Sequence, residues 1–434
     1  MKKHVHFLGI GGVGMCGLAA LAAANGAYVT GSDNRENRET ARLAAAGIPV
    51  TIGTDTASAA LADLLVYTAA VAPDHPERVT ARAGGVPTLS RAAYLGREMR
   101  AYPVRIGVAG THGKSTVTGM LAAIFAAAKQ DATVLCGAPL SAQEPPYRIG
   151  GKELLLFEAC EYKDSFLAFT PTIAVLNNLE WEHVDYFRTE AQMQESFRMY
   201  ATSAKTVIAN AEDACLAAAL GDMRRITFGR SHGDHTLRDG VWYAYGVPQG
   251  EISLSVLGTH NLQNALAAAA TAHTIGIPAD TICTALADFR GVERRMTFRG
   301  TLPCGARVYD DYAHHPTEVA ASLSAARATC RGRLICAFQS HTYSRTAAFL
   351  VAFQDVFAAT DVLYTLPIYA ARETNTFGVS AADIVAAHPM GAVCADATTL
   401  AAALMTCARP DDVVLLMGAG DIDSTLLHLP LSEF

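Results

Sequence analysis

Residues 107–116 read Gly-Val-Ala-Gly-Thr-His-Gly-Lys-Ser-Thr, and their types and spacing suit the binding of a phosphate group. Apolar residues lead into this glycine-bounded turn, and an alanine-rich segment that favours a helix follows it. Backbone N–H groups and the helix N-terminus would face the anion, while Lys114 adds a positive charge and Ser115 can hold Mg²⁺. The usual spacing of such loops asks for glycine at position 108, where this chain has valine. The pattern therefore predicts a variant loop that binds ATP or GTP.

A second glycine-rich turn lies near the N-terminus. Residues 9–14 read Gly-Ile-Gly-Gly-Val-Gly between a predicted strand and a predicted helix, and Asp33 follows 33 − 14 = 19 residues after Gly14. This arrangement predicts a site for a nucleotide diphosphate, with Asp33 near a ribose. A purely structural tight turn is the alternative. Taken alone, the motif would also suit a nicotinamide-dependent oxidoreductase, but that hypothesis leaves Lys114 unexplained.

Polar side chains follow several of the predicted strands. Glu158 and Glu161 lie at the end of one strand, and His183 lies just past another. Because the carboxyl ends of parallel strands converge on a ligand crevice, these groups could surround a metal ion next to phosphate. The alternative is that the acidic residues around His183 form a solvated loop, with His183 an ordinary polar residue.

Three further segments carry more polar residues than a helix start requires. Asn261 and Asn264 share one face of a predicted helix, where they either cap it or recognise a base. Residues 310–318 read Asp-Asp-Tyr-Ala-His-His-Pro-Thr-Glu, with Pro316 placed for a first helical turn. Residues 339–346 read Gln-Ser-His-Thr-Tyr-Ser-Arg-Thr after the next strand. The last two segments predict a second binding wall, with plain capped loops as the alternative.

Strands and helices alternate along the chain, which predicts α/β domains with parallel sheets. Boundaries are expected near residues 99–103 and 297–300, and residues 229–250 could form a hairpin excursion. The predicted strands are 4–10, 28–31, 104–109, 154–158, 173–177, 206–209, 307–310, 334–338, 362–365 and 413–417. The predicted helices are 14–25, 114–128, 261–274, 317–328 and 345–358.

Composition narrows the class of protein. The 434 residues suggest about three domains, and 51% hydrophobic residues argue against disorder. The net charge of −7, without a basic block, argues against nucleic-acid binding. Ten scattered cysteines without a C-x-x-C pair suit reduced thiols in a cytoplasmic protein. Regularly spaced glycines interrupt the apolar N-terminal stretch, which is not typical of a signal peptide. No other segment is long and apolar enough to predict a membrane span.

Seven motifs in this order resemble those of the Mur ligases, and the resemblance covers nearly the whole chain. They are Gly-Thr-His-Gly-Lys-Ser, Glu-Ala-Cys-Glu-Tyr, Asn-Leu-Glu-x-x-His-x-Asp, Gly-x-His-Asn-x-x-Asn-Ala, Gly-Val-x-Arg-Arg, Asp-Asp-Tyr-Ala-His-His-Pro-Thr-Glu and His-Thr-Tyr-Ser-Arg-Thr. The resemblance implies an α/β fold of three domains: an N-terminal Rossmann-like domain for a UDP-sugar (1–101), a central phosphate-loop ATPase domain with a mostly parallel sheet (102–298), and a C-terminal Rossmann-like domain for an amino acid (299–434).

The implied reaction is ATP-dependent formation of an amide between L-alanine and the carboxylate of UDP-N-acetylmuramate, through an acyl phosphate and with release of ADP and phosphate. This is a step of peptidoglycan precursor synthesis, which serves cell-wall biogenesis, cell shape and cell division. The implied cofactors are ATP and Mg²⁺, or Mn²⁺ in its place. The implied enzyme is cytoplasmic and monomeric or homodimeric, and neither a nucleic-acid partner nor a membrane span is expected. The alternatives are a ligase that joins a recycled murein tripeptide to the same sugar, and a non-catalytic phosphate-loop regulator.

The resemblance also assigns residues to roles. The implied ATP-binding residues are Gly110, Thr111, His112, Gly113, Lys114, Ser115, Thr116, Asn261, Asn264, Arg294 and Asp310. The implied UDP-sugar residues are Gly9, Gly11, Gly12, Gly14, Ser32 and Asp33. The implied amino-acid residues are Tyr312, His314, His315 and Arg345, the metal ligands are Ser115, Glu158 and His183, and the catalytic residues are Lys114, His183, His314 and Arg345. Either His314 or His315 is a candidate base for the amine.

This chain departs from the family pattern at three places. Glu182 stands where the resemblance leads us to expect Asp, Ser340 occupies a place often held by Pro, and Thr342 stands where many relatives carry Arg. The arginine pair of the last motif is thereby reduced to Arg345. Several relatives use a carbamylated lysine near the metal, but Lys163 does not match its position.

Overall fold

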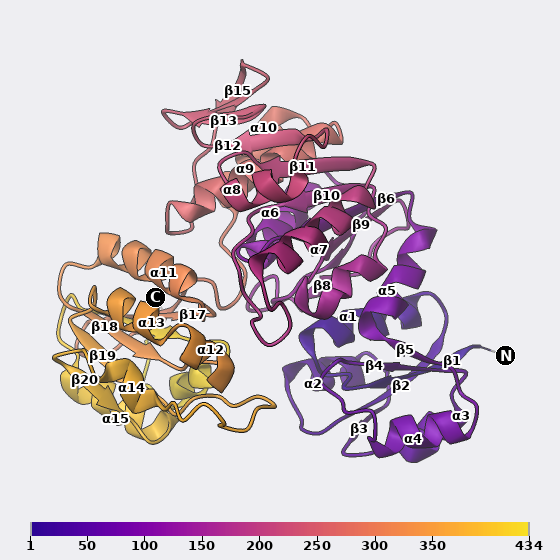
Figure 1. Cartoon of the computed structure of the whole chain (residues 1–434), viewed down its shortest axis with the longest axis horizontal. Helices are drawn as coiled ribbons and strands as arrows, with labels where there is room; N and C mark the ends of the chain where they lie inside the picture. The colour runs from indigo at the N-terminus through magenta and orange to yellow at the C-terminus, as the bar shows by residue number, and fades with distance from the viewer. Residues whose placement is uncertain (1, 433–434) are drawn as a thin grey trace. The chain divides into compact units, whose positions relative to one another are not determined.

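The computed structural model describes residues 2–432, and three β-sheets flanked by helices make up the fold (Figure 1). Contacts divide the chain into two compact units. The first unit comprises Met1–Glu180, Glu190–Ser253 and Asn264–Asp288, and the second comprises Trp181–Thr189, Leu254–Gln263 and Phe289–Phe434. The predicted α/β class with mostly parallel strands is confirmed.

The N-terminal sheet is parallel throughout, with strand order β3-β2-β1-β4-β5. Figure 1 shows α1 and α5 on one side of this sheet and α3 and α4 on the other. The strand order reverses between β1 and β4, so their carboxyl ends open a crevice for a ligand. The strands are β1 (His4–Leu8), β2 (Tyr28–Asp33), β3 (Val50–Ile52), β4 (Leu64–Tyr67) and β5 (Thr88–Ser90); the helices are α1 (Val13–Ala24), α2 (Arg38–Ala45), α3 (Thr56–Leu61), α4 (Pro76–Ala83), α5 (Arg91–Glu98) and the 3₁₀ helix η1 (Met99–Ala101).

The second sheet has ten strands in the order β15-β14-β13-β12-β11-β10-β6-β9-β7-β8. Strand β6 lies between β10 and β9 and runs parallel to both. The antiparallel strands β13 to β15 confirm the predicted hairpin excursion. The strands are β6 (Val104–Ala109), β7 (Thr133–Leu135), β8 (Tyr147–Arg148), β9 (Leu154–Glu158), β10 (Ile173–Leu176), β11 (Thr206–Asn210), β12 (Ile226–Gly229), β13 (His235–Arg238), β14 (Val241–Ala244) and β15 (Val247–Glu251); the helices are α6 (Lys114–Ala127), η2 (Tyr162–Ala168), α7 (Glu190–Thr202), α8 (Ala214–Leu220), α9 (His260–Thr274) and α10 (Ala279–Asp288).

The third sheet has the order β16-β17-β21-β18-β19-β20, and only β16 is antiparallel to its neighbour. Alternate residues of its central strands feed two separate hydrophobic clusters: Val308, Ile335 and Val414 belong to one, while Tyr309 and Cys336 belong to the other. A sheet buried on both faces requires this alternation. The strands are β16 (Thr297–Thr301), β17 (Arg307–Asp311), β18 (Leu334–Phe338), β19 (Val362–Thr365), β20 (Gly391–Val393) and β21 (Val413–Met417); the helices are α11 (Pro316–Thr329), α12 (Tyr343–Ala348), α13 (Leu350–Phe357), α14 (Ala381–Val385), α15 (Ala397–Cys407) and η3 (Ile422–His428).

The helix predicted over residues 345–358 is two helices, α12 and α13. Phe349 ends the first and precedes the second with φ −118° and ψ 19°, values outside the α-helical range. Its ring packs edge-on against His315, with the ring centroids 4.7 Å apart. Pro316 is the first residue of α11, as predicted.

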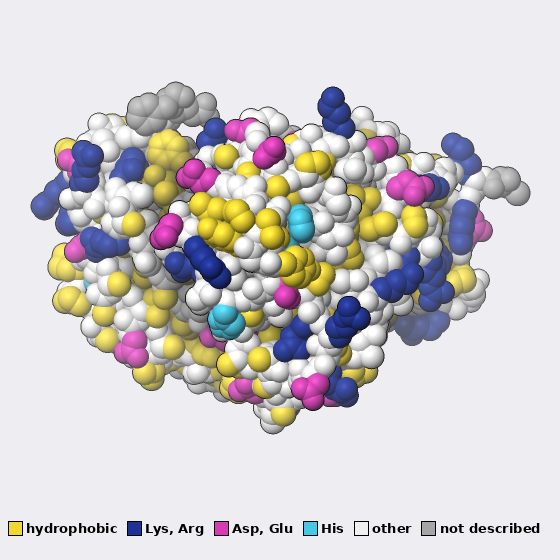
Figure 2. Space-filling model, turned by 90° about the horizontal axis from the view of Figure 1, so that it is seen from above, with side chains coloured by type: hydrophobic (Ala, Val, Ile, Leu, Met, Phe, Trp, Pro, Cys, Tyr) yellow, Lys and Arg dark blue, Asp and Glu magenta, His cyan; other side chains and the backbone are white. Residues whose placement is uncertain are grey.

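The surface and the cysteines agree with the composition. Figure 2 shows a face on which basic, acidic and apolar side chains are interspersed. Within residues 2–432, no helix combines the length and apolar character needed to cross a bilayer. The ten cysteines all lie in this range, and none forms a disulfide.

Candidate active site

The loop between β6 and α6 takes a shape that needs glycine at two positions. Gly110 and Gly113 have φ values of +139° and +80°, which disfavour residues with a Cβ atom. A Cβ on Gly113 would also lie 2.5 Å from Asn177 Nδ2 and would overlap Asn264 Oδ1. The backbone therefore passes closely over these two amides, and α6 begins directly after the loop at Lys114.

Two neighbouring asparagines that follow β10 hold the loop by hydrogen bonds to its backbone. Asn178 Oδ1 accepts the His112 N–H at 2.7 Å, and the side-chain amides of Asn177 and Asn178 each donate to the His112 carbonyl at 3.0 Å. Asn177 Nδ2 also donates to Asn264 Oδ1 at 2.8 Å. Hydrogen bonds are directional, so the bonds made by these two asparagines fix the conformation of the loop in the absence of a ligand. Asn264, predicted near adenine, lies under the loop.

Lys114 is held by three acceptors. Its Nζ donates to the carbonyls of Gly110 (2.5 Å) and Thr111 (3.1 Å), and lies 3.0 Å from the carboxylate of Glu161. The Glu161 side chain is 1% exposed. A buried carboxylate needs a paired cation, so Glu161 fixes the ammonium group at the mouth of the loop. From the sequence, Glu161 was a candidate only for the surroundings of a metal ion, and its pairing with Lys114 was not predicted.

Glu180 buttresses the other side of the loop. Its carboxylate lies 2.7 Å from His112 Nε2, and its backbone exchanges two hydrogen bonds with the Thr111 hydroxyl at 2.9 and 3.0 Å. Thr116 is buried in the first turn of α6. The predicted residues 110–116 therefore form one continuous structural unit.

Glu158 ends β9 opposite Val108 of β6, in the register of a parallel pair. Its carboxylate accepts a hydrogen bond from the backbone of Gly137 and lies 3.4 Å from Cys136 Sγ, which is 3.7 Å from the Ser115 carbonyl. A carboxylate and a hydroxyl offer the hard oxygen atoms that Mg²⁺ prefers, so Ser115 and Glu158 fit such an ion. His183, the third predicted ligand, belongs to the second unit.

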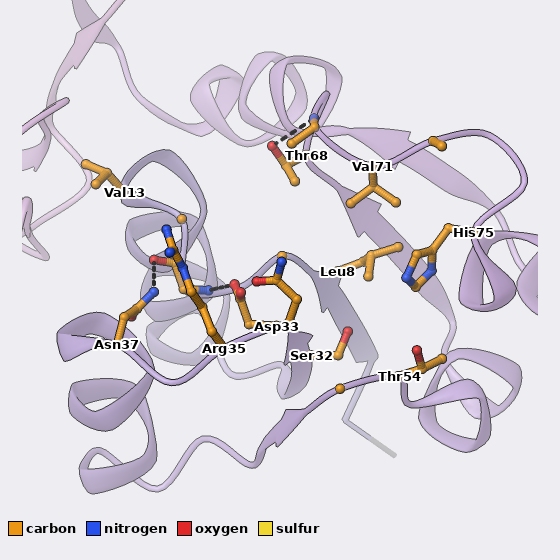
Figure 3. Close-up of a pocket in the computed structure, with 17 residues that line it drawn as sticks. Leu8, Val13, Ser32, Asp33, Arg35, Asn37, Thr54, Thr68, Val71 and His75 are labelled. Atoms are coloured by element: carbon orange, nitrogen blue, oxygen red, sulfur yellow. Dashed lines mark hydrogen bonds between the residues drawn. The ribbon is translucent and has the colours of Figure 1, made fainter. Parts of the chain in front are cut away.

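A cavity of about 710 Å³ opens at the carboxyl ends of the first four strands of the N-terminal sheet (Figure 3). Five of the six predicted UDP-sugar residues line it, and Gly14 instead faces the Arg91 side chain. Asp33 Oδ2 accepts the Gly11 N–H at 2.9 Å, and Figure 3 shows Asp33, Arg35 and Asn37 gathered at one end. The lining residues are Leu8, Gly9, Gly11, Gly12, Val13, Ser32, Asp33, Asn34, Arg35, Asn37, Gly53, Thr54, Thr68, Ala70, Val71, Ala72 and His75.

The N–H groups of this glycine turn are largely used within the protein. Gly9 and Ile10 donate to the Ser32 carbonyl, at 2.8 and 3.0 Å, and Gly12 donates to Gly9 at 3.2 Å. An anion at this turn must therefore rely on the first N–H groups of α1, which an α-helix leaves without intrahelical acceptors. Gly14 lies in that first turn, although its Cα does not line the cavity.

In the second unit, Arg345 and Glu182 form a buried ion pair. Arg345 Nη2 donates to Glu182 Oε1 at 2.7 Å, and His314 Nε2 lies 3.5 Å from the same oxygen. Burial alone would raise the pKa of Glu182, but Arg345, His314 and His183 hold that pKa well below its usual range. Glu182 is thus a fixed negative charge among three cationic or ionisable groups.

His341 completes this cluster. Arg345 Nη1 donates to the His341 carbonyl at 3.0 Å, and the His341 ring stacks on Tyr369 with centroids 5.6 Å apart. Burial and the positive charges of Arg345 and His314 lower the pKa of His341 to about 3, so it is neutral at physiological pH. The Tyr312 ring meets His314 edge-on at 5.5 Å. Three predicted residues, Tyr312, His314 and Arg345, therefore lie together.

His315 and Asn261 have local roles in this structure. His315 caps α11, where its Nδ1 accepts the Thr317 N–H at 3.4 Å. Asn261 Nδ2 donates to the Leu257 carbonyl at 2.6 Å. Asn261 belongs to the second unit and Asn264 to the first, so the division between the units passes through α9.

Arg294 and Asp310 lie next to each other, as their predicted shared role requires. Arg294 Nε is 3.6 Å from Asp310 Oδ1, and its other nitrogens donate to the carbonyls of Gly418 (2.6 Å) and Gly420 (3.2 Å). Burial raises the pKa of Asp310, and Arg294 and Arg299 counteract that rise. Arg299, at 3.0 Å from Asp310, was not singled out by the sequence.

Comparison of the whole chain with known proteins identifies its family. The model "Mur ligase family, catalytic domain" matches residues 4–103, "Mur ligase middle domain" matches 108–272, and "Mur ligase, glutamate ligase domain" matches 294–420. A UDP-N-acetylmuramate–L-alanine ligase from Agathobacter rectalis is 41% identical over 400 residues, which cover 88% of this chain and 87% of that protein. The chain belongs to the Mur ligase family.

Other Mur ligases match over the full length. The UDP-N-acetylmuramate–L-alanine ligase of Sorangium cellulosum is 37% identical over 452 residues, covering 98% of this chain and 96% of that one. The crystal structure of the UDP-N-acetylmuramate-alanine ligase of Thermotoga maritima superimposes with a TM-score of 0.84 at 26% identity, covering 98% of both chains. A murein peptide ligase of Psychrobacter arcticus shares the fold, with a TM-score of 0.75 at 24% identity over 100% of both chains.

Proposed function

We propose that this chain is an ATP-dependent ligase that joins L-alanine to the carboxylate of UDP-N-acetylmuramate and releases ADP and phosphate. The observation that carries the proposal is the Lys114 loop, braced by Glu161 and the two asparagines, in a chain 41% identical to a relative named for this reaction. The proposed product is a precursor of peptidoglycan, and the proposed location of the reaction is the cytoplasm. The proposed domains are residues 1–101, 102–298 and 299–434.

The chemistry has two steps. A carboxylate resists attack by an amine because it is negative and has no good leaving group. A carboxylate oxygen therefore attacks the γ-phosphorus of ATP, the bond to the β-phosphate oxygen breaks, and ADP leaves an acyl phosphate behind. The amine of L-alanine then attacks the acyl carbon, the C–O bond to phosphate breaks, and the amine loses a proton. Positioning and charge neutralisation carry most of the rate in such transfers.

The proposed phosphoryl site is the loop of residues 110–116. Lys114 would neutralise the phosphate oxygens, and the N-terminus of α6 would face them. Ser115 and Glu158 would hold Mg²⁺ together with His183, and the ion would supply further neutralisation of phosphate charge. Asn261, Asn264, Arg294 and Asp310 are the further proposed ATP contacts; Asn264 also braces the loop, and Arg294 pairs with Asp310.

The UDP-sugar is proposed to occupy the N-terminal cavity, whose volume of about 710 Å³ is in the range of nucleotide-sized ligand sites. Gly9, Gly11, Gly12 and Ser32 line it, and Gly14 contributes through the first turn of α1. Asp33 holds the glycine turn, and Arg35 offers a cation that the sequence had not singled out.

The amino acid is proposed to bind at the cluster of Tyr312, His314 and Arg345. Arg345 would contact a carboxylate or the tetrahedral oxyanion, and His314 would accept the proton of the amine. His315, the other candidate base, serves as the cap of α11, which favours His314. The pH profiles of His314→Ala and His315→Ala would distinguish the two candidate bases.

The deciding experiment measures phosphate release by the purified chain with ATP, Mg²⁺, UDP-N-acetylmuramate and either L-alanine or murein tripeptide. We expect turnover with L-alanine and at least about a hundredfold lower kcat/KM with the tripeptide. Preference for the tripeptide would show that the protein catalyses the recycling reaction instead. Lys114→Ala should abolish release, and near-normal turnover of that variant at saturating ATP would remove the assignment.

A further inference from the structure

A buried carboxylate lies behind the wall of the N-terminal cavity without lining it. Glu77, on α4, is 0% exposed, and it accepts three hydrogen bonds. Its Oε2 accepts from the Ser32 hydroxyl at 2.8 Å and from His6 Nε2 at 3.0 Å, while its Oε1 accepts the Asp55 N–H at 2.7 Å. The donors come from β1, β2 and the start of α3, three elements far apart in the sequence.

Each partner of Glu77 on the cavity side leads to a different part of the wall. Ser32 itself lines the cavity, and Asp55 directly follows the lining residues Gly53 and Thr54. The third link is local: the Glu77 N–H donates to His75 Nδ1 at 3.3 Å, and His75 lines the cavity as the cap of α4. Figure 3 shows Ser32, Thr54 and His75 around the same end of the cavity, away from Arg35 and Asn37.

On the side away from the cavity, Glu77 joins a buried series of hydrogen-bonded polar side chains. His6 is 0% exposed, and its Nδ1 pairs with the Thr30 hydroxyl at 2.8 Å. The same hydroxyl pairs with His4 Nε2 at 2.8 Å. Burial of such groups is costly unless every one is bonded, and an apolar core would be at least as stable. Stability alone therefore gives no reason for a carboxylate at this position.

We propose that Glu77 is a positioning residue of the nucleotide cavity: it fixes Ser32, the Gly53–Thr54 turn and His75 in the geometry that binds the UDP-sugar, without touching that ligand. The inference rests on the proposed function for the identity of the ligand. The Ser32 carbonyl also receives the N–H groups of Gly9 and Ile10. A shift of Ser32 would therefore carry over to the glycine turn.

The test compares Glu77→Gln with Thr30→Val. Gln keeps the size of Glu77 but has one acceptor oxygen, so it cannot accept from both Asp55 and Ser32 in the present geometry. Thr30→Val disturbs the same buried series on the other side of His6 and leaves every bond of Glu77 to the wall in place. We expect Glu77→Gln to raise the KM for UDP-N-acetylmuramate by about tenfold, a typical effect of losing a bond to a charged group. Its kcat and its KM for ATP should stay within about twofold, and Thr30→Val should change none of the three values by more than that.

Two results would overturn the inference. One is an unchanged KM for the UDP-sugar in folded Glu77→Gln, and the other is an equal rise in both variants, which would mean a general loss of stability. If Glu77→Gln does not fold, Glu77→Asp provides the same comparison, because it keeps the charge and shortens the reach. Calorimetric binding of UDP separates this inference from the proposed function. A wild-type chain that binds UDP but makes no product with L-alanine would contradict the function, while the ratio of UDP affinities would still decide the role of Glu77.

Discussion

Arg345 and Glu182, 163 positions apart in the sequence, meet in a buried ion pair with 2.7 Å between Nη2 and Oε1. Thr342, where the resemblance led us to expect a second arginine, caps α12 and accepts the Arg345 N–H at 3.4 Å. The single guanidinium is therefore already engaged by a carboxylate of the chain. Glu182 holds Arg345 in place and would compete for it with a substrate carboxylate if Arg345 binds one, as proposed.

Replacing Glu182 by Gln should lower stability. The change leaves Arg345 buried without its counterion, which typically costs about 3–5 kcal/mol. Because the folded pKa of Glu182 is depressed, its contribution is complete above the unfolded value of about 4.3 and is lost as pH falls through the lower folded pKa. Urea midpoints of wild type and variant should differ most at neutral pH and converge in acid. A difference that is the same at pH 7 and pH 3 would contradict the ion-pair account.

Lys114 and Glu161 allow stability and activity to be separated. Lys114→Met should lower the melting temperature, because the buried carboxylate of Glu161 loses the ammonium group that lies 3.0 Å away. Adding Glu161→Gln should recover much of that loss by removing the charge. Phosphate release should stay abolished in the double variant, because the ammonium group that Lys114 is proposed to place at the phosphates is absent. Recovery of turnover along with stability would show that Lys114 acts only on the fold.

The local parts of the site were predictable from the sequence. The loop at Gly110–Lys114 and the turn at Gly9–Gly14 depend on residues close in the chain, and glycine patterns report such backbone shapes directly. The strand ends at which Glu158 and Asp310 lie were also predictable, since each of these residues follows a short apolar run. The structure confirms the strands β6, β9, β18, β19 and β21 at the predicted bounds.

The long-range partners were not predictable. Asn178 under the loop, Glu161 on Lys114 and Glu182 on Arg345 are pairings between segments that only the fold brings together. The break at Phe349 has a similar origin, because its ring packs against His315 from another helix. Propensity alone could not place it, since the alanine-rich stretch around it favours one continuous helix.

Gly113→Ala should weaken nucleotide binding, and Gly26→Ala is its matched control. Both glycines have left-handed φ values, +80° and +88°, so each substitution carries a backbone cost of about 1–2 kcal/mol. Only at Gly113 would the new Cβ also overlap Asn264 and Asn177; at Gly26 it meets open space. We expect ATP affinity, measured by calorimetry, to fall at least about tenfold for Gly113→Ala and to remain unchanged for Gly26→Ala. Equal losses of affinity would mean that loop shape is unimportant for the nucleotide.

Asp311 should give a pH dependence of stability opposite in sign to that of Glu182. It is buried, and it accepts bonds from the N–H groups of Ala313 (2.7 Å) and Met296 (2.8 Å). Burial nevertheless raises its pKa to about 6, only partly offset by Arg295 and these bonds. The folded state therefore binds a proton at Asp311 more tightly than the unfolded state does. The contribution of Asp311 to stability is complete in acid and declines as pH rises from about 4 to 6, by on the order of 3 kcal/mol.

Asp311→Asn removes this titration and keeps one acceptor oxygen. The stability of wild type relative to Asp311→Asn should therefore fall between pH 4 and pH 6 and stay level above pH 7, as measured by urea midpoints. The Glu182→Gln difference moves the other way over the acid range, because one carboxyl pKa is raised by burial and the other is lowered by its cations. Both carboxylates lie in the second unit of the chain. Opposite pH trends for the two variants would therefore show that the groups around each carboxylate determine its pH dependence, and that acid does not act on the whole unit in one direction. A relative stability of wild type and Asp311→Asn that rises with pH would contradict the raised pKa.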